Sequence, residues 1–257
     1  MNRLHSPKAL KFKLPSPVHQ KALAATPNTT ALPELDPLRL DRRESHHTLF
    51  VPLHYERGYA YPLVVWLHAD GGNERELRQV MPLVSVRNYV AVAARGVSPA
   101  GSRDSFTWRQ SAQAASEAAN CVDECIEAAK ERFNINPRRV FIAGHAAGGT
   151  MALRLALQFP DWFAGAVSLG GPMPSGNCPL KCVNHARCLP LLLSSCKQSA
   201  EYPPARVAED LRLLHSAGFS LSLRQYPGDA ELTTGMLADM DRWIMEQVCV
   251  ARSTSGV

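Results

Sequence analysis

One segment decides how this chain folds: Arg139-Val140-Phe141-Ile142-Ala143-Gly144-His145-Ala146-Ala147-Gly148-Gly149-Thr150. Its first half is mainly apolar and predicts a strand over residues 139–145, and the glycines that follow predict a sharp turn into a helix. Such a turn holds its apex residue in a strained conformation and points that side chain above the sheet. The apex here is Ala146, between Gly144 and Gly148. A methyl group cannot attack a carbonyl carbon, so the turn can present a nucleophile but has none.

Strand-like and helix-like segments alternate on both sides of this turn. The other expected strands are residues 47–53 (an edge strand), 62–68, 89–95, 163–169, 189–195 and 220–226, and the expected helices are residues 74–84, 111–133, 147–159, 204–216 and 231–248. The run 62–68 is apolar almost throughout, as in a strand that is buried on both faces. This alternation predicts an α/β fold, with a mainly parallel sheet and helices on both faces.

The chain divides into an arm and one folded domain. Residues 1–44 contain six prolines without any sustained periodicity and predict an irregular arm, whereas residues 45–250 carry the α/β pattern. A net charge of +5 lies within residues 1–33 of the arm, where five basic residues precede the first acidic residue, Glu34, and the rest of the chain is balanced. A basic arm can contact nucleic acid or anionic lipid, but five widely spaced charges are typical of a solvated tail. We therefore do not expect nucleic acid as a partner.

The cysteines and the apolar runs indicate the cellular setting. Seven cysteines, an odd number, predict free thiols rather than a disulfide framework. The sequence contains no run of eighteen or more uncharged apolar residues, so it predicts no membrane span, and the N-terminus lacks the apolar core of a secretory signal. We expect a cytoplasmic protein, and the sequence does not specify its oligomeric state. Cys178, Cys182, His185 and Cys188 could supply four zinc ligands, but their spacing matches no common zinc motif, so we expect neither a metal nor a cofactor.

Three signatures give the chain a family resemblance over residues 47–248. They are Val64-Val65-Trp66-Leu67-His68 ahead of Gly71-Gly72-Asn73, Asn136-Pro137-Arg138-Arg139-Val140-Phe141-Ile142-Ala143-Gly144-His145 ahead of Gly148-Gly149, and Leu223-Arg224-Gln225-Tyr226-Pro227-Gly228 ahead of a C-terminal helix. With these motifs the chain resembles the phospholipase/carboxylesterase branch of the α/β-hydrolases, which includes the acyl-protein thioesterases. The resemblance implies the α/β-hydrolase fold and a carboxylic-ester or thioester hydrolase with a triad of Ser, Asp and His.

The resemblance places all three triad positions on residues that cannot perform the chemistry. The nucleophile position falls on Ala146, the acid on Gln198 with Ser199 as the alternative, and the histidine on Ala230. A single engineered Ser→Ala change would explain Ala146 but not Gln198 and Ala230. We therefore expect a natural pseudoenzyme that has lost hydrolysis and keeps a small acyl or ester ligand.

The remaining site residues carried over from the family concern the oxyanion hole and the pocket. The oxyanion hole would use the backbone N–H of Ala147 and that of Ala69 or Asp70, although the family usually has glycine where Ala69 stands. The pocket would involve His68, Trp108 and His145.

Two other functions remain open from the sequence. The chain could be an active ester hydrolase with a displaced hydroxyl, for which Thr150 and Ser168 are the candidates. It could also be a binding scaffold that is recruited through the basic arm. We expect structural roles for His68, His145 and His215.

Overall fold

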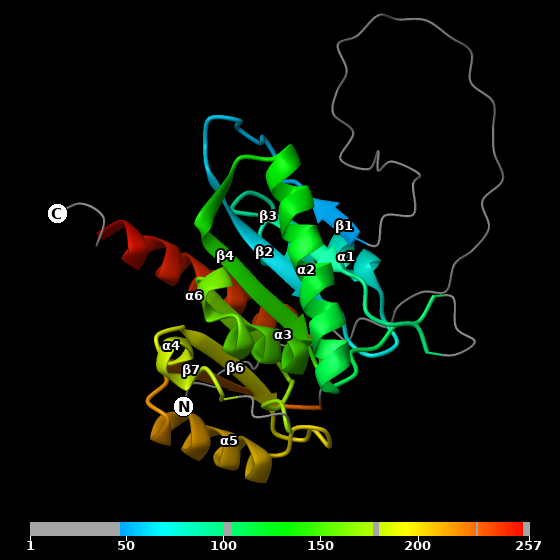
Figure 1. Ribbon diagram of the computed structural model, residues 1–257, viewed down its shortest axis with the longest axis vertical. Coiled ribbons are helices and arrows are strands. Elements are labelled where there is room, and N and C mark those ends of the chain that lie inside the picture. The colour runs from blue at the N-terminus through cyan, green and yellow to red at the C-terminus, as the bar shows by residue number, and fades with distance from the viewer. Residues whose placement is uncertain (1–46, 100–103, 177–179, 230, 254–257) are drawn as a thin grey trace, which may run out of the picture. The chain divides into compact units, whose positions relative to one another are not determined.

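The computed structural model describes residues 47–99, 104–176, 180–229 and 231–253 (Figure 1). The arm predicted at residues 1–44 lies outside the described residues, as do Cys178 and Ala230.

The core of the domain is one seven-stranded sheet in the order β1-β3-β2-β4-β5-β6-β7. The strands are β1 (His47–Phe50), β2 (Tyr61–Leu67), β3 (Val90–Ala94), β4 (Ile135–His145), β5 (Gly165–Leu169), β6 (Leu191–Cys196) and β7 (Leu221–Tyr226). Strand β1 lies at the edge and runs antiparallel to β3, and all other neighbours are parallel. The mainly parallel α/β sheet predicted from the alternating pattern is confirmed.

Helices cover both faces of this sheet. They are α1 (Leu77–Val84), α2 (Ala112–Arg132), α3 (Ala147–Gln158), α4 (Val183–Ala186), α5 (Pro204–Ser216) and α6 (Thr234–Ser253), with short 3₁₀ turns at Glu74–Glu76 and Pro160–Trp162. In Figure 1, α2 and α3 lie in front of the strands and α6 passes behind β4. No helix among the described residues is long and apolar enough to cross a membrane.

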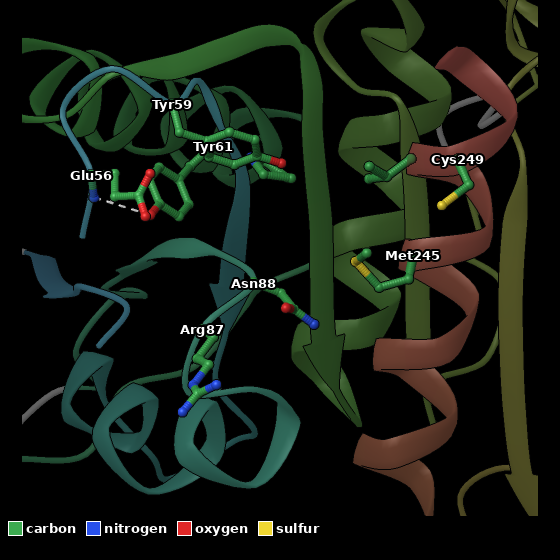
Figure 2. A pocket seen from close by; sticks show the side chains of 9 residues that line it. Glu56, Tyr59, Tyr61, Arg87, Asn88, Met245 and Cys249 are labelled. Atoms are coloured by element: carbon green, nitrogen blue, oxygen red, sulfur yellow. Dashed lines mark hydrogen bonds between the residues drawn. The ribbon is translucent and has the colours of Figure 1, made fainter. Parts of the chain in front are cut away.

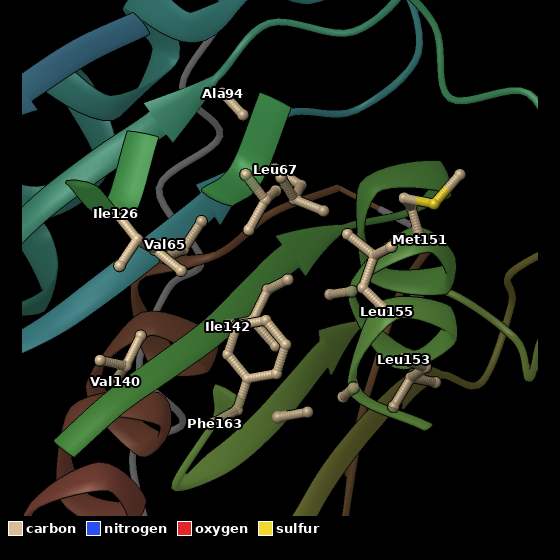
Figure 3. Packing of buried hydrophobic residues seen from close by; sticks show 14 of the residues in the cluster. Val65, Leu67, Ala94, Ile126, Val140, Ile142, Met151, Leu153, Leu155 and Phe163 are labelled. Atoms are coloured by element: carbon tan, nitrogen blue, oxygen red, sulfur yellow. The ribbon is translucent and has the colours of Figure 1, made fainter. Parts of the chain in front are cut away.

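Alternate side chains of each central strand enter two separate apolar clusters. In β2, Val65 and Leu67 pack with residues of α2 and α3, whereas Val64 and Trp66 pack with α1 and α6. Figure 3 shows the first cluster, in which strand side chains such as Ile142 meet the side chains of α3. Burial of the strands on both faces explains why their sequences are continuously apolar.

The structure corrects the predicted start of β4. This strand begins at Ile135, before Pro137, whereas the sequence predicted Arg139. Proline cannot donate to a β-ladder. Its position is tolerated because the pairing of β2 with β4 shifts register between Tyr61 and Leu63. The strand predicted at residues 47–53 likewise ends at Phe50, ahead of Pro52.

Candidate active site

The turn between β4 and α3 has a strained apex. Ala146 adopts φ 49° and ψ −117°, and it is one of two described non-glycine residues with positive φ. Its N–H donates to the carbonyl of Leu169 at 2.9 Å, and its own carbonyl accepts the N–H of Thr150 at 3.0 Å. Such a conformation costs on the order of 1–3 kcal/mol and persists only where its surroundings impose it. A strained strand-to-helix turn at residues 144–148, hereafter called the elbow, therefore presents a methyl side chain at its apex.

Two glycines make this turn sterically possible. A Cβ on Gly148 would lie 2.3 Å from the carbonyl oxygen of Leu67, at the end of β2. A Cβ on Gly144 would lie 2.4 Å from the backbone of Gly148. The start of α3 thus packs directly against the backbone of β2, and no other side chain fits at either glycine.

The turn expected to carry the acid lies beside the loop expected to carry the histidine. The N–H of Gln198 donates to the carbonyl of Gly228 at 2.9 Å, and the N–H of Lys197 donates to that of Tyr226 at 3.0 Å. Ala230 follows Gly228 by two residues and lies outside the described residues.

The two alternatives for the acid position differ in burial. Gln198 is exposed, whereas Ser199 is 4% exposed. The Ser199 hydroxyl accepts the N–H of Tyr202 at 3.1 Å. The side chain that points into the protein is therefore that of Ser199, the alternative that the sequence ranked second.

The turn after β2 is held by the loop that precedes α2. Asp70 accepts hydrogen bonds from the hydroxyl of Thr107 and from the N–H of Trp108, the latter at 3.4 Å. Phe106 exchanges two backbone hydrogen bonds with Gly71 and Gly72, at 2.9 and 3.0 Å. This ladder fixes the backbone of the turn whose N–H groups are candidates for an oxyanion hole.

His68 is fully buried, and both of its ring nitrogens are occupied. Its Nε2 accepts the N–H of Gly96 at 3.0 Å, so Nδ1 carries the proton and donates to the carbonyl of Ala69 at 2.8 Å. Burial lowers the pKa of this imidazole. Trp108 is 4% exposed and donates from Nε1 to the His68 carbonyl at 2.9 Å. Both side chains are packed parts of the structure, and Trp108 also lines a cavity of about 150 Å³.

The other two candidate histidines differ in burial. His145 is half-buried at the end of β4, paired in register with Leu169 of β5. His215 is exposed in the last turn of α5.

The two hydroxyls proposed as displaced nucleophiles donate to one loop. The Thr150 hydroxyl donates to the carbonyl of Pro172 at 2.9 Å, and the buried Ser168 hydroxyl donates to that of Gly171 at 2.7 Å. Gly171 lies directly against the elbow, because a Cβ there would meet the Ala146 carbonyl oxygen at 2.3 Å. Both hydroxyls therefore hold residues 170–176 against the elbow.

Two further side chains, which sequence reasoning missed, hold the same loop. Arg154 of α3 is 4% exposed and donates to the carbonyl of Ser175 at 2.7 Å and to the side chain of Gln110 at 2.9 Å. Asp210 of α5, also 4% exposed, accepts the N–H of Met173 at 2.9 Å. Burial lowers the pKa of the Arg154 guanidinium. The one local signal was an arginine within the apolar run Leu153–Leu157 of α3.

The cysteines give no metal site among the residues that the structure places. Those residues contain no group of three or more His, Cys, Asp or Glu side chains suited to a metal ion. Cys182 is half-buried and Cys188 is exposed, while Cys178 of the same cluster is not described.

Comparisons with known proteins agree with this fold. The model of a family described as "Putative esterase" matches residues 41–202. A "Putative esterase NocK" of Nocardia uniformis subsp. tsuyamanensis is 35% identical over 120 residues, which are 44% of this chain and 34% of that protein, so the match spans about a third of the relative's length.

Solved structures give the same result for the fold. A carboxylesterase of Bacillus cereus superposes with a TM-score of 0.62 at 18% identity, covering 78% of this chain and 93% of the other. SOBER1 of Arabidopsis thaliana superposes with a TM-score of 0.60 at 20% identity, covering 74% of this chain and 100% of the other. The seven-stranded sheet with its helices is therefore an α/β-hydrolase fold.

Proposed function

Since the chain belongs to this esterase family, we propose that it is a phospholipase/carboxylesterase-type homologue that binds an acyl or ester ligand at the elbow without hydrolysing it. The observation that carries the proposal is Ala146, a methyl group at an apex with φ 49°. A triad enzyme forms its acyl intermediate through the side chain at this point, and alanine can form none.

Magnitudes support loss of turnover together with retention of binding. In a well-studied protease, removing the catalytic serine costs on the order of 10⁶ in turnover and leaves roughly 10³ to 10⁴ over water. The residual part comes from binding and from backbone donors. At the elbow the candidate donor is the N–H of Ala147, at the start of α3, which the change of side chain at Ala146 does not remove. The positive end of the helix dipole adds to its attraction for a carbonyl oxygen.

The contacts of the alternative nucleophiles argue against an active enzyme. A nucleophilic hydroxyl needs a base that takes its proton, but Thr150 and Ser168 direct theirs to the carbonyls of Pro172 and Gly171. His68 has no free nitrogen to act as that base. The third reading, recruitment through the basic arm, concerns residues outside the described part of the chain.

Restoring the triad tests the proposal. We would measure hydrolysis of 4-nitrophenyl acetate by the native chain and by a variant carrying Ala146→Ser, Ser199→Asp and Ala230→His. The native chain should match a heat-denatured sample, and the variant should turn over, because Ser199 is the buried candidate for the acid.

The matched control carries Gln198→Asp in place of Ser199→Asp, with the other two changes kept. It should remain far slower, because an exposed carboxylate at residue 198 would not orient the new histidine. Native turnover well above the denatured sample would overturn the pseudoenzyme proposal.

A further inference from the structure

Two loops reach the elbow from different strands. Residues 170–176 follow β5 and pack against the Ala146 carbonyl through Gly171. Residues 104–110 lie between β3 and α2 and contact the turn after β2 through Trp108. Ligands bind at this end of a parallel sheet, so the two loops are the natural walls of a site at the elbow.

The side chain of Arg154 joins these two loops. It lies about two turns into α3 and donates from Nη2 to the carbonyl of Ser175 at 2.7 Å, in the first loop. From Nε it donates to Oε1 of Gln110 at 2.9 Å, in the second loop. Arginine can only donate, so Gln110 presents its oxygen to Arg154 and its Nε2 to the carbonyl of Trp108, at 3.2 Å. One chain of hydrogen bonds therefore runs from Ser175 to Trp108.

Trp108 extends this chain of hydrogen bonds into the turn after β2. Its N–H donates to the carboxylate of Asp70 at 3.4 Å, and its Nε1 donates to the carbonyl of His68 at 2.9 Å. The Trp108 side chain is buried, so it cannot shift without repacking its neighbours. Movement of either loop is therefore transmitted to the other through contacts that the structure shows.

Arg154 is costly to bury at this position. It is 4% exposed within the apolar run Leu153–Leu157, and it forms no ion pair among the described residues. Taking a charge out of water without a counter-ion destabilises the folded state. An apolar side chain of similar length would avoid this cost, so folding alone does not account for an arginine here.

We propose that Arg154 is a positioning residue for the site at the elbow: it couples residues 170–176 to residues 104–110, so that the two loops become ordered and loosen together. A ligand that orders one wall of the site then also orders the other. The nature of that ligand rests on the function proposed above, whereas the coupling is a property of the native chain without ligand.

Amide hydrogen exchange, measured by NMR on the full chain, tests the coupling. The two reporters are the N–H of Met173, which donates to Asp210 at 2.9 Å, and the Nε1–H of Trp108. Arg154→Met should speed exchange at both reporters roughly tenfold relative to the N–H of Val65 in the buried strand β2. The urea midpoint of this variant should stay the same or rise, because a buried charge is removed.

Gln110→Leu separates coupling from a purely local effect. Gln110 has no hydrogen bond to residues 170–176 in the described part of the chain, so it can act on them only through Arg154. The variant should nevertheless speed exchange at Met173 by about threefold or more, as expected when a coupling residue is changed. Gln113→Leu, the same substitution at an exposed position of α2, should leave both reporters unchanged.

A second control lies at the opposite ends of the strands. A cavity of about 290 Å³ there is lined by Tyr61, the first residue of β2, by Asn88, just before β3, and by Cys249 of α6 (Figure 2). None of the described residues that line this cavity belongs to either loop. Cys249→Ser, at an exposed position, should therefore leave exchange at Met173 and Trp108 unchanged.

Two results would overturn the proposal. One is unchanged exchange at Met173 in the Gln110→Leu variant, because the loops would then move independently. The other is equal acceleration at Met173, Trp108 and Val65 in the Arg154→Met variant, because Arg154 would then serve folding only. If Arg154→Met does not fold, the Gln110→Leu variant decides the question. The test needs neither ligand nor turnover, so it and the test of the pseudoenzyme proposal can fail independently.

Discussion

At the scale of single residues, the apex of the elbow combines a strained backbone conformation with a side chain that cannot react. Ala146 has a φ of 49°, which is costly for any residue with a Cβ. In an active hydrolase this strain positions a nucleophile, but a methyl group gains nothing from it. The strain at Ala146 should therefore be measurable as lost stability.

Replacing Ala146 with glycine should raise the free energy of unfolding by about 1 kcal/mol, because glycine enters this conformation at little cost. Urea unfolding of both proteins measures the difference. The same change at Ala208, an exposed position in α5, should instead lower stability by about 1 kcal/mol. If both variants lost stability equally, the backbone at Ala146 would not be strained.

At the scale of elements, an ion pair ties the 3₁₀ turn after β2 to the end of β3. Arg95 donates from Nε and Nη2 to the two carboxylate oxygens of Glu74, at 2.8 and 2.7 Å, and its guanidinium lies 5.0 Å from the centroid of the Phe106 ring. Burial is the largest single influence and raises the pKa of Glu74, but the hydrogen bonds from Arg95, a backbone hydrogen bond and the nearby positive charges together outweigh it, so the pKa is lowered. Phe106 pairs with Gly71 and Gly72, so the ion pair also supports the turn that follows β2.

The lowered pKa sets the direction of a pH dependence. The folded state binds fewer protons at Glu74 than the unfolded state, so this stabilisation is complete above the unfolded pKa of about 4.3 and is lost as the pH falls through the folded value. Urea unfolding should show Glu74→Gln destabilised by about 3 kcal/mol at pH 7, with a smaller further loss on acidification than the native chain. Glu127→Gln, in the exposed pair with Lys130, should cost less than about 1 kcal/mol. If the free energy of unfolding fell with the same slope below pH 5 in the native chain and in the Glu74→Gln variant, this prediction would be contradicted.

Local patterns predicted the elements well and the loop contacts poorly. Strand β2 was found because burial on both faces leaves an uninterrupted apolar run, and the elbow because Gly144 and Gly148 admit no Cβ. Arg154 and Asp210 were missed because their partners, Ser175 and Met173, lie on a different element and offer backbone atoms, which leave no mark in the sequence. Choosing Ser199 over Gln198 also required burial, which adjacent residues in a turn do not reveal.

At the scale of the whole molecule, the net charge of the chain lies ahead of the folded domain. The sequence assigns the net charge of +5 to residues 1–33, ahead of the α/β domain. The cores on both faces of the sheet are built from residues 49 to 248. The domain should therefore fold without the arm.

A chain that begins at residue 45 should have a Tm within about 2 °C of that of the full chain, because losing the arm should change the free energy of unfolding by less than about 1 kcal/mol. In a domain of this size a change of 1 kcal/mol shifts the Tm by roughly 2 °C or more. Binding of either chain to duplex DNA, measured at several salt concentrations, should be weak. Strong, salt-dependent binding that disappears with the arm would instead support recruitment through it.

The packing of Gly148 against the Leu67 carbonyl has a consequence for how this chain tolerates mutation. Substitutions at the two glycines of the elbow would collide with backbone, so selection for folding alone removes them. Substitutions at Ala146 and Ser199 meet no such barrier, because smaller or neutral side chains fit there. A lineage released from the need to hydrolyse esters would thus lose its reactive groups by drift while its folding requirement preserved the turn, and the path back to a catalyst would consist of side-chain changes alone.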